Sequence, residues 1–528
     1  MNNTPTRLIA AKRLAVAVAA VCATLAAPAF ADDDVKVLLE LMLKKGVITQ
    51  QDYDQFMKDN ADSAENKEFK NKRLDSDVTK SVTFMQKRAT DGAVRENGLG
   101  LTSADGQHTI NLTGRVHFDG RAINSNFAEG DTLDKDSGTL GNNFEVRRAR
   151  IGINGKLFKD FGYELVTNAV GSNANLIDTA FITYGFNPKA QVRVGRFKQG
   201  FSLEELTSSN NIDFMERSYV NQFIPGKQLG AMLFGVPSIG TTYSASVFQN
   251  GFSNNTSEGG GEGAMRLTGN FAEMAGNKDT VMHVGFAGTA GSFDAIPTSS
   301  SSGGNSTDLN LLALRSEARG MSNIFRIRQA GESLGTTTVS GVTSNNIGYS
   351  APSPSGTKVN KNLYGIEFVA AWDALKVQGE MAQVKLQAID YQGTSLKGSV
   401  DASYIQVVYN ITGEKWADSY KDGSFGALKI KSNFDYSGSG TGAWQVGLRF
   451  SQYDGTDLYN ATASGKRAGS EKGNTTTLGL TWFLNPNARI MLNYSQSIFD
   501  RPFQAIDVNT GATDDQERVI ALRTQLNF

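Results

Sequence analysis

The chain ends in a segment that has one apolar and one polar side. Within residues 517–528 the two sets fall on opposite parities: Ile520, Leu522, Leu526 and Phe528 against Arg523, Gln525 and Asn527. A period of two places these sets on opposite faces of an extended strand. Strands of outer-membrane barrels have this form, with lipid on one face and water on the other. A soluble antiparallel sheet also alternates, so the interpretation depends on how often the pattern recurs.

The same alternation recurs from about residue 108 to the C-terminus. The segments that show it are 108–119, 144–157, 163–170, 176–186, 191–198, 229–236, 243–249, 265–271, 281–288, 364–370, 375–381, 399–409, 444–450, 478–484, 490–494 and 517–528. In one of them the apolar parity changes near Arg147-Arg148, which predicts a β-bulge of one extra residue. This repetition predicts an all-β transmembrane fold.

The lengths of the connections indicate on which side of the membrane each connection lies. Short turns such as 485–487 alternate with long polar links such as 454–474, and barrels of this class have short periplasmic turns, long outer loops and an even strand number. With all short turns on one side there are nine strands up to Ala290 and seven from Asn362. We therefore expect a closed antiparallel β-barrel of about 16 strands.

Two further segments, residues 311–319 and 324–328, also look extended. If both crossed the membrane the strand count would be 18. We place them instead in or near an outer loop.

The N-terminal region precedes the strands and has a different composition. Residues 1–31 are predicted to be a signal peptide, with a basic end, an apolar stretch and an Ala-Phe-Ala cleavage site; a membrane anchor is the alternative. Residues 32–60 have helical periodicity and predict a short helical, self-associating or loosely docked segment. Residues 61–100 read as a polar linker, and residues 101–528 as the barrel.

Composition excludes several functional classes. The net charge is −1, so no basic excess points to nucleic acid. The single cysteine, Cys22, lies in the leader, which removes disulfides and thiolate metal sites from the mature chain. The three histidines lack metal-ligand spacing, and no catalytic set has supporting context. We expect no enzyme activity, no metal and no cofactor.

One stretch interrupts the strand pattern. About thirty residues between Lys198 and Gln228 have no period of two, yet they include large apolar side chains such as Phe201, Leu203, Leu206, Ile212, Phe214 and Met215. A link of that length is usually functional or disordered, and this one is too apolar for a solvated loop. A barrel of about sixteen strands has a water-filled bore. We expect the stretch to fold inward and narrow that bore.

Several motifs resemble the phosphate-selective porin O and P family. They are Val194–Gln199, Leu203–Ser209, Phe214–Ser218, Arg147–Arg150, Tyr409–Glu414, Gly442–Phe450 and Leu478–Leu492, and the resemblance spans roughly Thr109 to Phe528. It implies a sixteen-stranded trimeric outer-membrane barrel. An inward loop, a basic lining and hydroxyls would guide anions through it.

The resemblance also implies site residues. Ser208, Ser209 and Arg217 match motif positions that line the anion site of the phosphate-binding members, and hydroxyls and a guanidinium suit an oxyanion. This chain departs from the pattern at Glu205, where those members have a lysine. A carboxylate there is expected to repel phosphate. An ion pair between Glu216 and Arg217 that pins the loop is the alternative role for that arginine.

The polar parity of the strands supplies further candidates for the pore constriction and anion pathway. They are Arg115, Arg147, Arg148, Arg150, Arg193 and Arg449. Rings of one sign of charge select ions of the opposite sign. Alternatively, these arginines pair with carboxylates on neighbouring strands and brace the wall.

These observations predict an outer-membrane porin that passes small hydrophilic, anionic solutes by diffusion. Phosphate-like anions are implied by the resemblance. The expected partners are outer-membrane lipid, two further copies in a homotrimer and the permeating anions, with no nucleic acid. Two alternatives stay open: a non-selective diffusion porin, and a barrel enzyme or structural surface protein.

Overall fold

The computed structural model describes most of the barrel region and little of the N-terminal region. The described residues are 43–44, 49–51, 53–54, 99–103, 105–124, 142–170, 176–249, 260–295, 310–320, 324–328, 333–339, 342–347, 357–389, 395–461, 467–500 and 515–528. The chain divides into two compact units, Met1–Val94 and Arg95–Phe528.

Only short pieces of the first unit are described. Residues 43–44, 50–51 and 53–54 are helical, and the Tyr53 amide donates to the Thr49 carbonyl at 3.0 Å. The predicted signal peptide, the rest of the two short helices and nearly all of the predicted linker lie outside the described residues.

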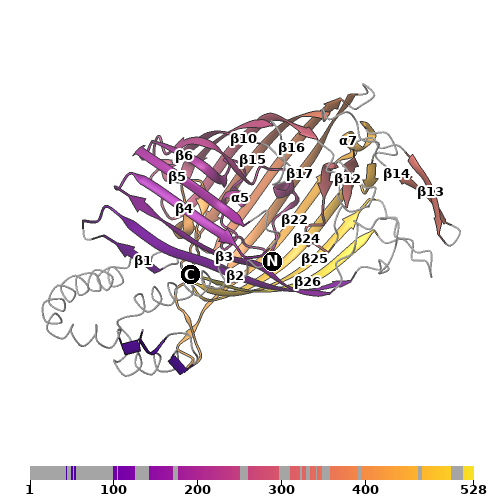
Figure 1. Ribbon diagram of the computed structural model, residues 1–528. Helices are drawn as coiled ribbons and strands as arrows, with labels where there is room; N and C mark the ends of the chain where they lie inside the picture. Colours follow the sequence, from indigo (N-terminus) through magenta and orange to yellow (C-terminus); the bar gives the residue numbers. More distant parts are fainter. Residues whose placement is uncertain are drawn as a thin grey trace, which may run out of the picture. The chain divides into compact units, whose positions relative to one another are not determined.

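The second unit is built on a seventeen-stranded sheet that closes on itself (Figure 1). Its wall strands are β2 Thr109–Asn124, β3 Asn143–Leu157, β4 Phe161–Asn168, β5 Ile177–Asn187, β6 Ala190–Lys198, β7 Lys227–Gly235, β8 Thr241–Gln249, β9 Gly261–Asn270, β10 Thr280–Ala295, β15 Thr357–Trp372, β16 Leu375–Ile389, β17 Ser395–Asn410, β22 Ala443–Asp454, β24 Lys472–Asn485, β25 Ala488–Phe499 and β26 Gln516–Asn527.

Each wall strand pairs antiparallel with the next, and β26 pairs with β2 to close the barrel. The prediction of sixteen strands, nine and then seven, is confirmed. The seventeenth strand, β1 (Leu99–Thr102), pairs with the first residues of β2 and begins just before the predicted end of the linker.

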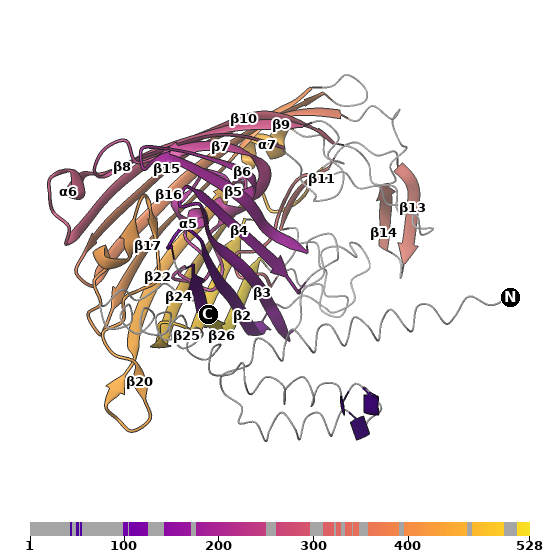
Figure 2. The same ribbon diagram turned by 60° about the vertical axis from the view of Figure 1, so that its left-hand side comes forward.

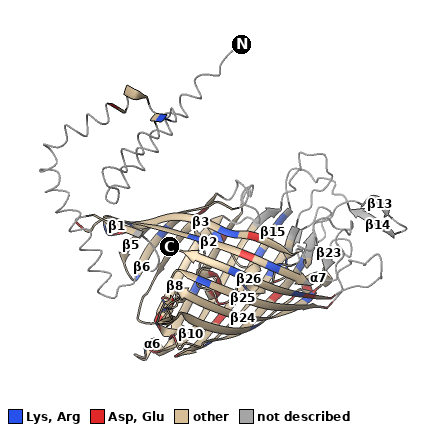
Figure 3. Cartoon of the chain, turned by 90° about the horizontal axis from the view of Figure 1, so that it is seen from below, with Lys and Arg blue, Asp and Glu red and all other residues tan. Residues whose placement is uncertain are grey.

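The two faces of the wall follow the predicted parity. On β26, Leu522 is 47% exposed on the outside while Arg523 on the inside is fully buried. Figure 3 marks the positions of charged residues as scattered segments of the wall strands, among residues of other types. The predicted bulge is confirmed as well, because the register between β2 and β3 skips Arg147.

The two ends of the barrel differ in their connections. Tight turns join β3 to β4, β5 to β6, β7 to β8, β15 to β16 and β24 to β25 at one end, and the four-residue helix α6 (Phe271–Met274) lies in the β9–β10 connection there. The other end carries the long links, as predicted. The connection from β17 to β22 is a long exception at the short-turn end.

The segments at residues 311–319 and 324–328 do not join the wall. β11 (Asn310–Leu314) and β12 (Phe325–Arg328) form a separate small sheet with β23 (Arg467–Gly469). Their placement in a loop at the long-link end is confirmed. The hairpin of β13 (Ser333–Val339) and β14 (Val342–Ile347) belongs to the same connection, and helix α7 (Thr456–Ala461) lies in the link after β22.

Two inward segments fill part of the lumen. The inward loop, residues 199–226, contains α5 (Leu203–Leu206) and the 3-10 helix η2 (Tyr219–Gln222), and both views place α5 within the ring of strands (Figures 1 and 2). The inward connection, residues 414–428 of the link from β17 to β22, holds η3 (Ala417–Ser419), β18 (Tyr420–Lys421) and β19 (Ser424–Phe425). The rest of the link forms the exposed hairpin of β20 (Phe434–Asp435) and β21 (Gly440–Thr441), which projects away from the wall strands (Figure 2).

The inward loop packs its apolar side chains against several wall strands. Leu203 and Phe214 of the inward loop pack with Trp416 and Phe425 of the inward connection, against β10, β15 and β17. Tyr219 and other loop residues pack near Phe325 against β15, β16, β17 and β22. Met215 packs with Met491 of β25 and Val519 of β26. The loop is therefore held against the wall strands from β10 round to β26.

Among the described helices, none combines the length and apolar character needed to cross a membrane.

Candidate functional site

The inward loop is shaped by its own polar groups. Ser202 has a left-handed backbone conformation (φ 64°) and caps α5, since its hydroxyl accepts from the Glu205 amide at 3.1 Å. The Glu204 amide donates to Glu380 on β16 at 2.7 Å. Phe201, Leu203 and Phe214 are each 1% exposed. The predicted inward fold of this stretch thus combines apolar burial with hydrogen bonds to the wall.

A buried group of charges, here called the clamp cluster, holds the far part of the loop. Its members are Asp119 and Arg121 of β2, Arg147 of β3, Glu216 of the loop and Arg523 of β26. Arg523 donates to both oxygens of Asp119, at 2.6 and 2.7 Å. Arg121, Arg147 and Arg523 each lie 3.2 Å from Oε1 of Glu216. The loop carboxylate is therefore enclosed by three arginines from three strands.

The pKa of Glu216 reflects this enclosure. Burial by itself raises the pKa, but Arg147, Arg523 and other arginines outweigh burial and hold it well below the usual glutamate range. The carboxylate stays ionised at neutral pH.

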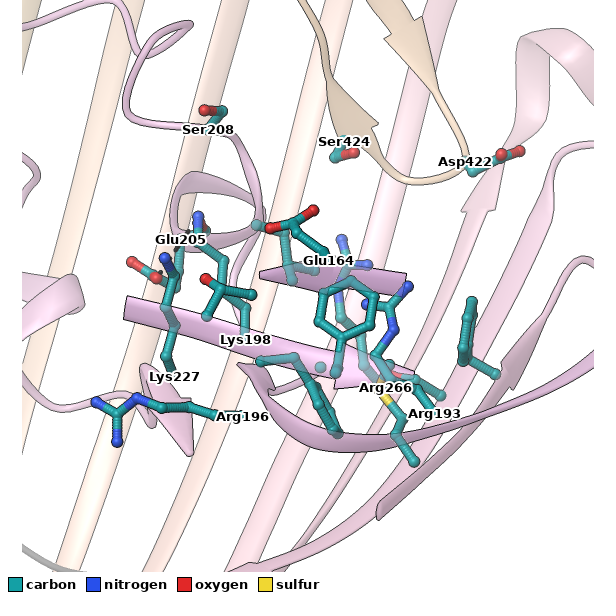
Figure 4. A pocket seen from close by; sticks show the side chains of 18 of the residues that line it. Glu164, Arg193, Arg196, Lys198, Glu205, Ser208, Lys227, Arg266, Asp422 and Ser424 are labelled. Carbon is teal, nitrogen blue, oxygen red and sulfur yellow. Dashed lines mark hydrogen bonds and ion pairs between the residues drawn. The ribbon is translucent and has the colours of Figure 1, made fainter. Parts of the chain in front are cut away.

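A cavity of about 770 Å³ lies between the inward loop and strands β2–β9. Nine basic and four acidic residues line it: Arg115, Arg148, Arg150, Arg193, Arg196, Lys198, Arg217, Lys227 and Arg266, with Glu164, Asp178, Glu205 and Asp422. Figure 4 shows Lys198, Lys227 and Glu205 gathered on one side, with Arg193, Arg266 and Glu164 on another. The excess of positive charge is local, since the whole chain has a net charge of −1.

Comparison with known proteins decides the family. The sequence profile of the phosphate-selective porin O and P family matches residues 112–325 and 326–528. The chain belongs to this family. Porin O of Pseudomonas aeruginosa is 26% identical over 460 residues, which cover 82% of this chain and 93% of that porin.

Similar solved structures are distant. The outer-membrane channel DcaP of Acinetobacter baumannii has a TM-score of 0.46 at 11% identity, over 81% of this chain and 99% of its own. An anion-selective porin from Comamonas acidovorans has a TM-score of 0.42 at 12% identity, over 80% and 100%. The family match alone makes the chain a porin of the bacterial outer membrane, so its short-turn end faces the periplasm.

Five cavity cations of the porin share three carboxylate partners. Arg150 and Lys227 both contact Asp178, Lys198 and Arg217 both contact Glu205, and Arg266 contacts Glu367. Three others have no carboxylate within 4.0 Å among the residues that the structure describes. Arg115 donates to the Ser209 hydroxyl at 2.9 Å, Arg148 lies 3.3 Å from His117 Nδ1, and Arg193 donates to the Thr183 hydroxyl at 3.0 Å.

The motif residues of the loop lie together at the cavity. Ser208 and Ser209 line it, and the Ser208 hydroxyl accepts from the Asn210 amide at 3.3 Å. Arg217 lines it too, but its guanidinium donates to the carbonyls of Glu204, Glu205 and Thr207 at 2.9–3.3 Å. Arg217 thus holds the loop, though its carboxylate partner is Glu205 and not the adjacent Glu216.

The carboxylate of Glu205 is paired with two cations, so it is not an isolated negative charge in the cavity. Its oxygens lie 3.6 Å from Lys198 and 3.4 Å from Arg217, and one accepts from Asn221 at 2.8 Å. Burial by itself raises its pKa, but Arg217 and then Lys198 outweigh burial and lower it to about 2. The carboxylate offsets part of the positive charge that Lys198 and Arg217 would otherwise present to a solute.

Two of the predicted arginines lie outside the cavity. Arg147 belongs to the clamp cluster. Arg449 on β22 is 2% exposed and lies 3.2 Å from Glu204 and 2.5 Å from Glu317, with its guanidinium 4.6 Å from the Phe214 ring. Both contact the inward loop and hold it against the wall.

The sequence pattern missed the inward connection. Its Trp416 and Phe425 rings lie 3.7 and 4.3 Å from the ammonium group of Lys376, and its Tyr420 hydroxyl lies 2.7 Å from His283. Asp422 and Ser424 of the same segment line the cavity. The signal that could have indicated burial is the presence of two large aromatic residues, Trp416 and Phe425, within this long connection.

Proposed function

We propose that this porin passes small hydrophilic anions by diffusion through the cavity beside its inward loop. The carrying observation is the group of cavity arginines, Arg115, Arg148 and Arg193, with no carboxylate within 4.0 Å among the described residues. In a narrow bore with a low-dielectric wall, such charges raise the local concentration of anions. The inward loop narrows the bore and sets the size limit.

Reversal potential across a planar bilayer under a KCl gradient tests this function. We expect a value that favours chloride. A value near zero, or one that favours potassium, contradicts anion preference.

A non-selective diffusion pore is the second candidate. It is favoured by the five cavity residues that already have carboxylate partners. The same measurement separates the two, because paired charges leave chloride and potassium permeating at similar rates.

The channel needs no catalytic group, and we propose diffusion without any reaction. The assembly we propose is a homotrimer in outer-membrane lipid, as family membership implies, with residues 1–31 removed on export. Migration of unheated protein on a denaturing gel tests the trimer. N-terminal sequencing of the mature chain is expected to begin at Asp32.

A further inference from the structure

One side of the cavity combines a cation with aromatic side chains. On β6, Arg193 pairs across the sheet with Thr183 of β5 and Met232 of β7. Phe181 and Phe234, which flank this row, also line the cavity. This part of the cavity wall therefore places two phenylalanine rings and Met232 beside Arg193, and Glu164 and Arg266 lie on the same side of the cavity (Figure 4).

The rings hold Arg193 in place without neutralising it. Its guanidinium carbon lies 4.2 Å from the ring centre of Phe181 and 4.8 Å from that of Phe234, distances typical of cation–π contacts. Its Nε donates to the Thr183 hydroxyl. No carboxylate lies within 4.0 Å among the described residues. The terminal nitrogens are thus oriented by the rings and available to an anion.

A glycine allows the neighbouring strand to approach this group closely. Gly195, two residues along β6, has φ +131°, and a Cβ there would lie 2.2 Å from the Ala180 carbonyl oxygen and 3.0 Å from Phe181 Cβ. No side chain larger than hydrogen fits this position without displacing backbone. The glycine therefore lets the backbone of Phe181 lie against β6, with the Phe181 ring next to Arg193.

This lining does not match the needs of an inorganic anion. Phosphate would desolvate against Phe181, Phe234 and Met232 and gain nothing from them. A solute with an aromatic ring would bury that ring against the phenylalanines, and its carboxylate would accept two parallel hydrogen bonds from Arg193. A cavity of about 770 Å³ is large enough for such a molecule.

We propose that the Arg193 site binds aromatic monocarboxylates during permeation. The proposal rests on the proposed anion channel and names a class of solute for it.

The test is block of single-channel chloride current by benzoate, cyclohexanecarboxylate and acetate, which carry the same charge. We expect benzoate to block the wild-type porin at roughly fivefold lower concentration than acetate, the size of one favourable ring contact. Cyclohexanecarboxylate is expected to fall between them. Equal potency of benzoate and acetate, or of benzoate and cyclohexanecarboxylate, overturns the proposal.

Substitutions of the two phenylalanines test whether benzoate binds at the Arg193 site. Phe181→Ala and Phe234→Leu are each expected to bring the benzoate-to-acetate ratio close to one. Phe286→Ala is the matched control, since Phe286 is 59% exposed on the lipid face of β10 and far from the lumen side of the wall. A ratio that survives both lumen substitutions overturns the assignment to Arg193. Failure of anion selectivity itself would appear separately, in the wild-type reversal potential.

Discussion

Two arginine-rich regions line the lumen of this porin, and they differ in what the guanidinium groups face. In the clamp cluster, the three arginines Arg121, Arg147 and Arg523 surround the carboxylate of Glu216. In the cavity, Arg115, Arg148 and Arg193 contact a hydroxyl, an imidazole and two phenyl rings. The clamp cluster is satisfied within the protein, whereas the cavity arginines retain a charge that a solute can meet.

The arginines of the two regions are therefore expected to have different roles. Buried charge pairs contribute little net stability, but removing one partner costs much because the other is left without compensation. The clamp cluster should therefore control the position of the inward loop. The cavity arginines should control which solutes pass. Matched substitutions in the two regions test whether the two roles are separate.

The largest expected effect comes from Glu216→Gln. Loss of this carboxylate leaves Arg147 with no carboxylate within 4.0 Å among the described residues, while Arg121 and Arg523 keep Asp119. Removing one partner of a buried ion pair costs about 3–5 kcal/mol. We expect a lower unfolding temperature in detergent and an altered single-channel conductance as the loop leaves the wall. The matched control is Glu164→Gln in the cavity, which is expected to change the unfolding temperature little. Equal loss in both variants would remove the distinction between the regions.

The second expected effect is on selectivity. Arg115→Gln removes a cavity charge without a carboxylate partner, so the chloride-to-potassium permeability ratio should fall roughly two- to fivefold, as for a partly screened charge. Arg147→Gln removes the same charge from the clamp cluster and should lower stability more than selectivity. Reversal potentials and melting curves of both variants make the comparison. The reverse pattern would assign the anion pathway to the clamp cluster.

A third effect, no larger than the second, is expected from Glu205→Gln. The substitution keeps the shape of the side chain, and Arg217 retains its three backbone carbonyl acceptors. Lys198 and Arg217 lose the carboxylate that cancels their charge, so block of chloride current by phosphate should strengthen roughly two- to fivefold. Unchanged block would mean that solutes do not approach this pair. Titration of block with phosphate in wild type and variant is the measurement.

The sequence was sufficient for the wall and for the existence of the inward loop. Strand parity predicts sixteen strands and the bulge at Arg147, because lipid and water impose a period of two on every strand. Parity also places Arg449 and Arg115 alike on the lumen face. It does not predict that Arg449 meets Glu204, because the two residues are 245 positions apart and approach only across the lumen.

Strand parity also fails to predict which way the apolar residue Phe181 faces. An aromatic residue within an alternating segment is expected to face lipid, yet its ring lies under Arg193 inside the barrel. Its parity is displaced because the register between β4 and β5 shifts near Thr167. A bulge at one position therefore changes which side chains a solute meets, and nothing in the local residue types marks that bulge.

Acidification is expected to have the smallest effect. The informative result is the absence of a conductance change from titration of the loop carboxylates. A carboxylate whose pKa is lower in the folded chain than in the unfolded chain contributes stability above its unfolded-state pKa, and the contribution is lost as pH falls through the folded-state value. The pKa of Glu205 is lowered to about 2, and that of Glu216 is also held well below its usual range.

Both loop carboxylates should therefore remain ionised from pH 6 to pH 4, and their titration should produce no transition in the single-channel conductance in that interval. A transition with a midpoint near 4.5, the usual glutamate range, would mean that the arginines and Lys198 do not stabilise these charges. Glu205→Gln removes one of the two titrating groups. A transition that persists in this variant would assign it to Glu216, and so to the clamp cluster and not to the cavity.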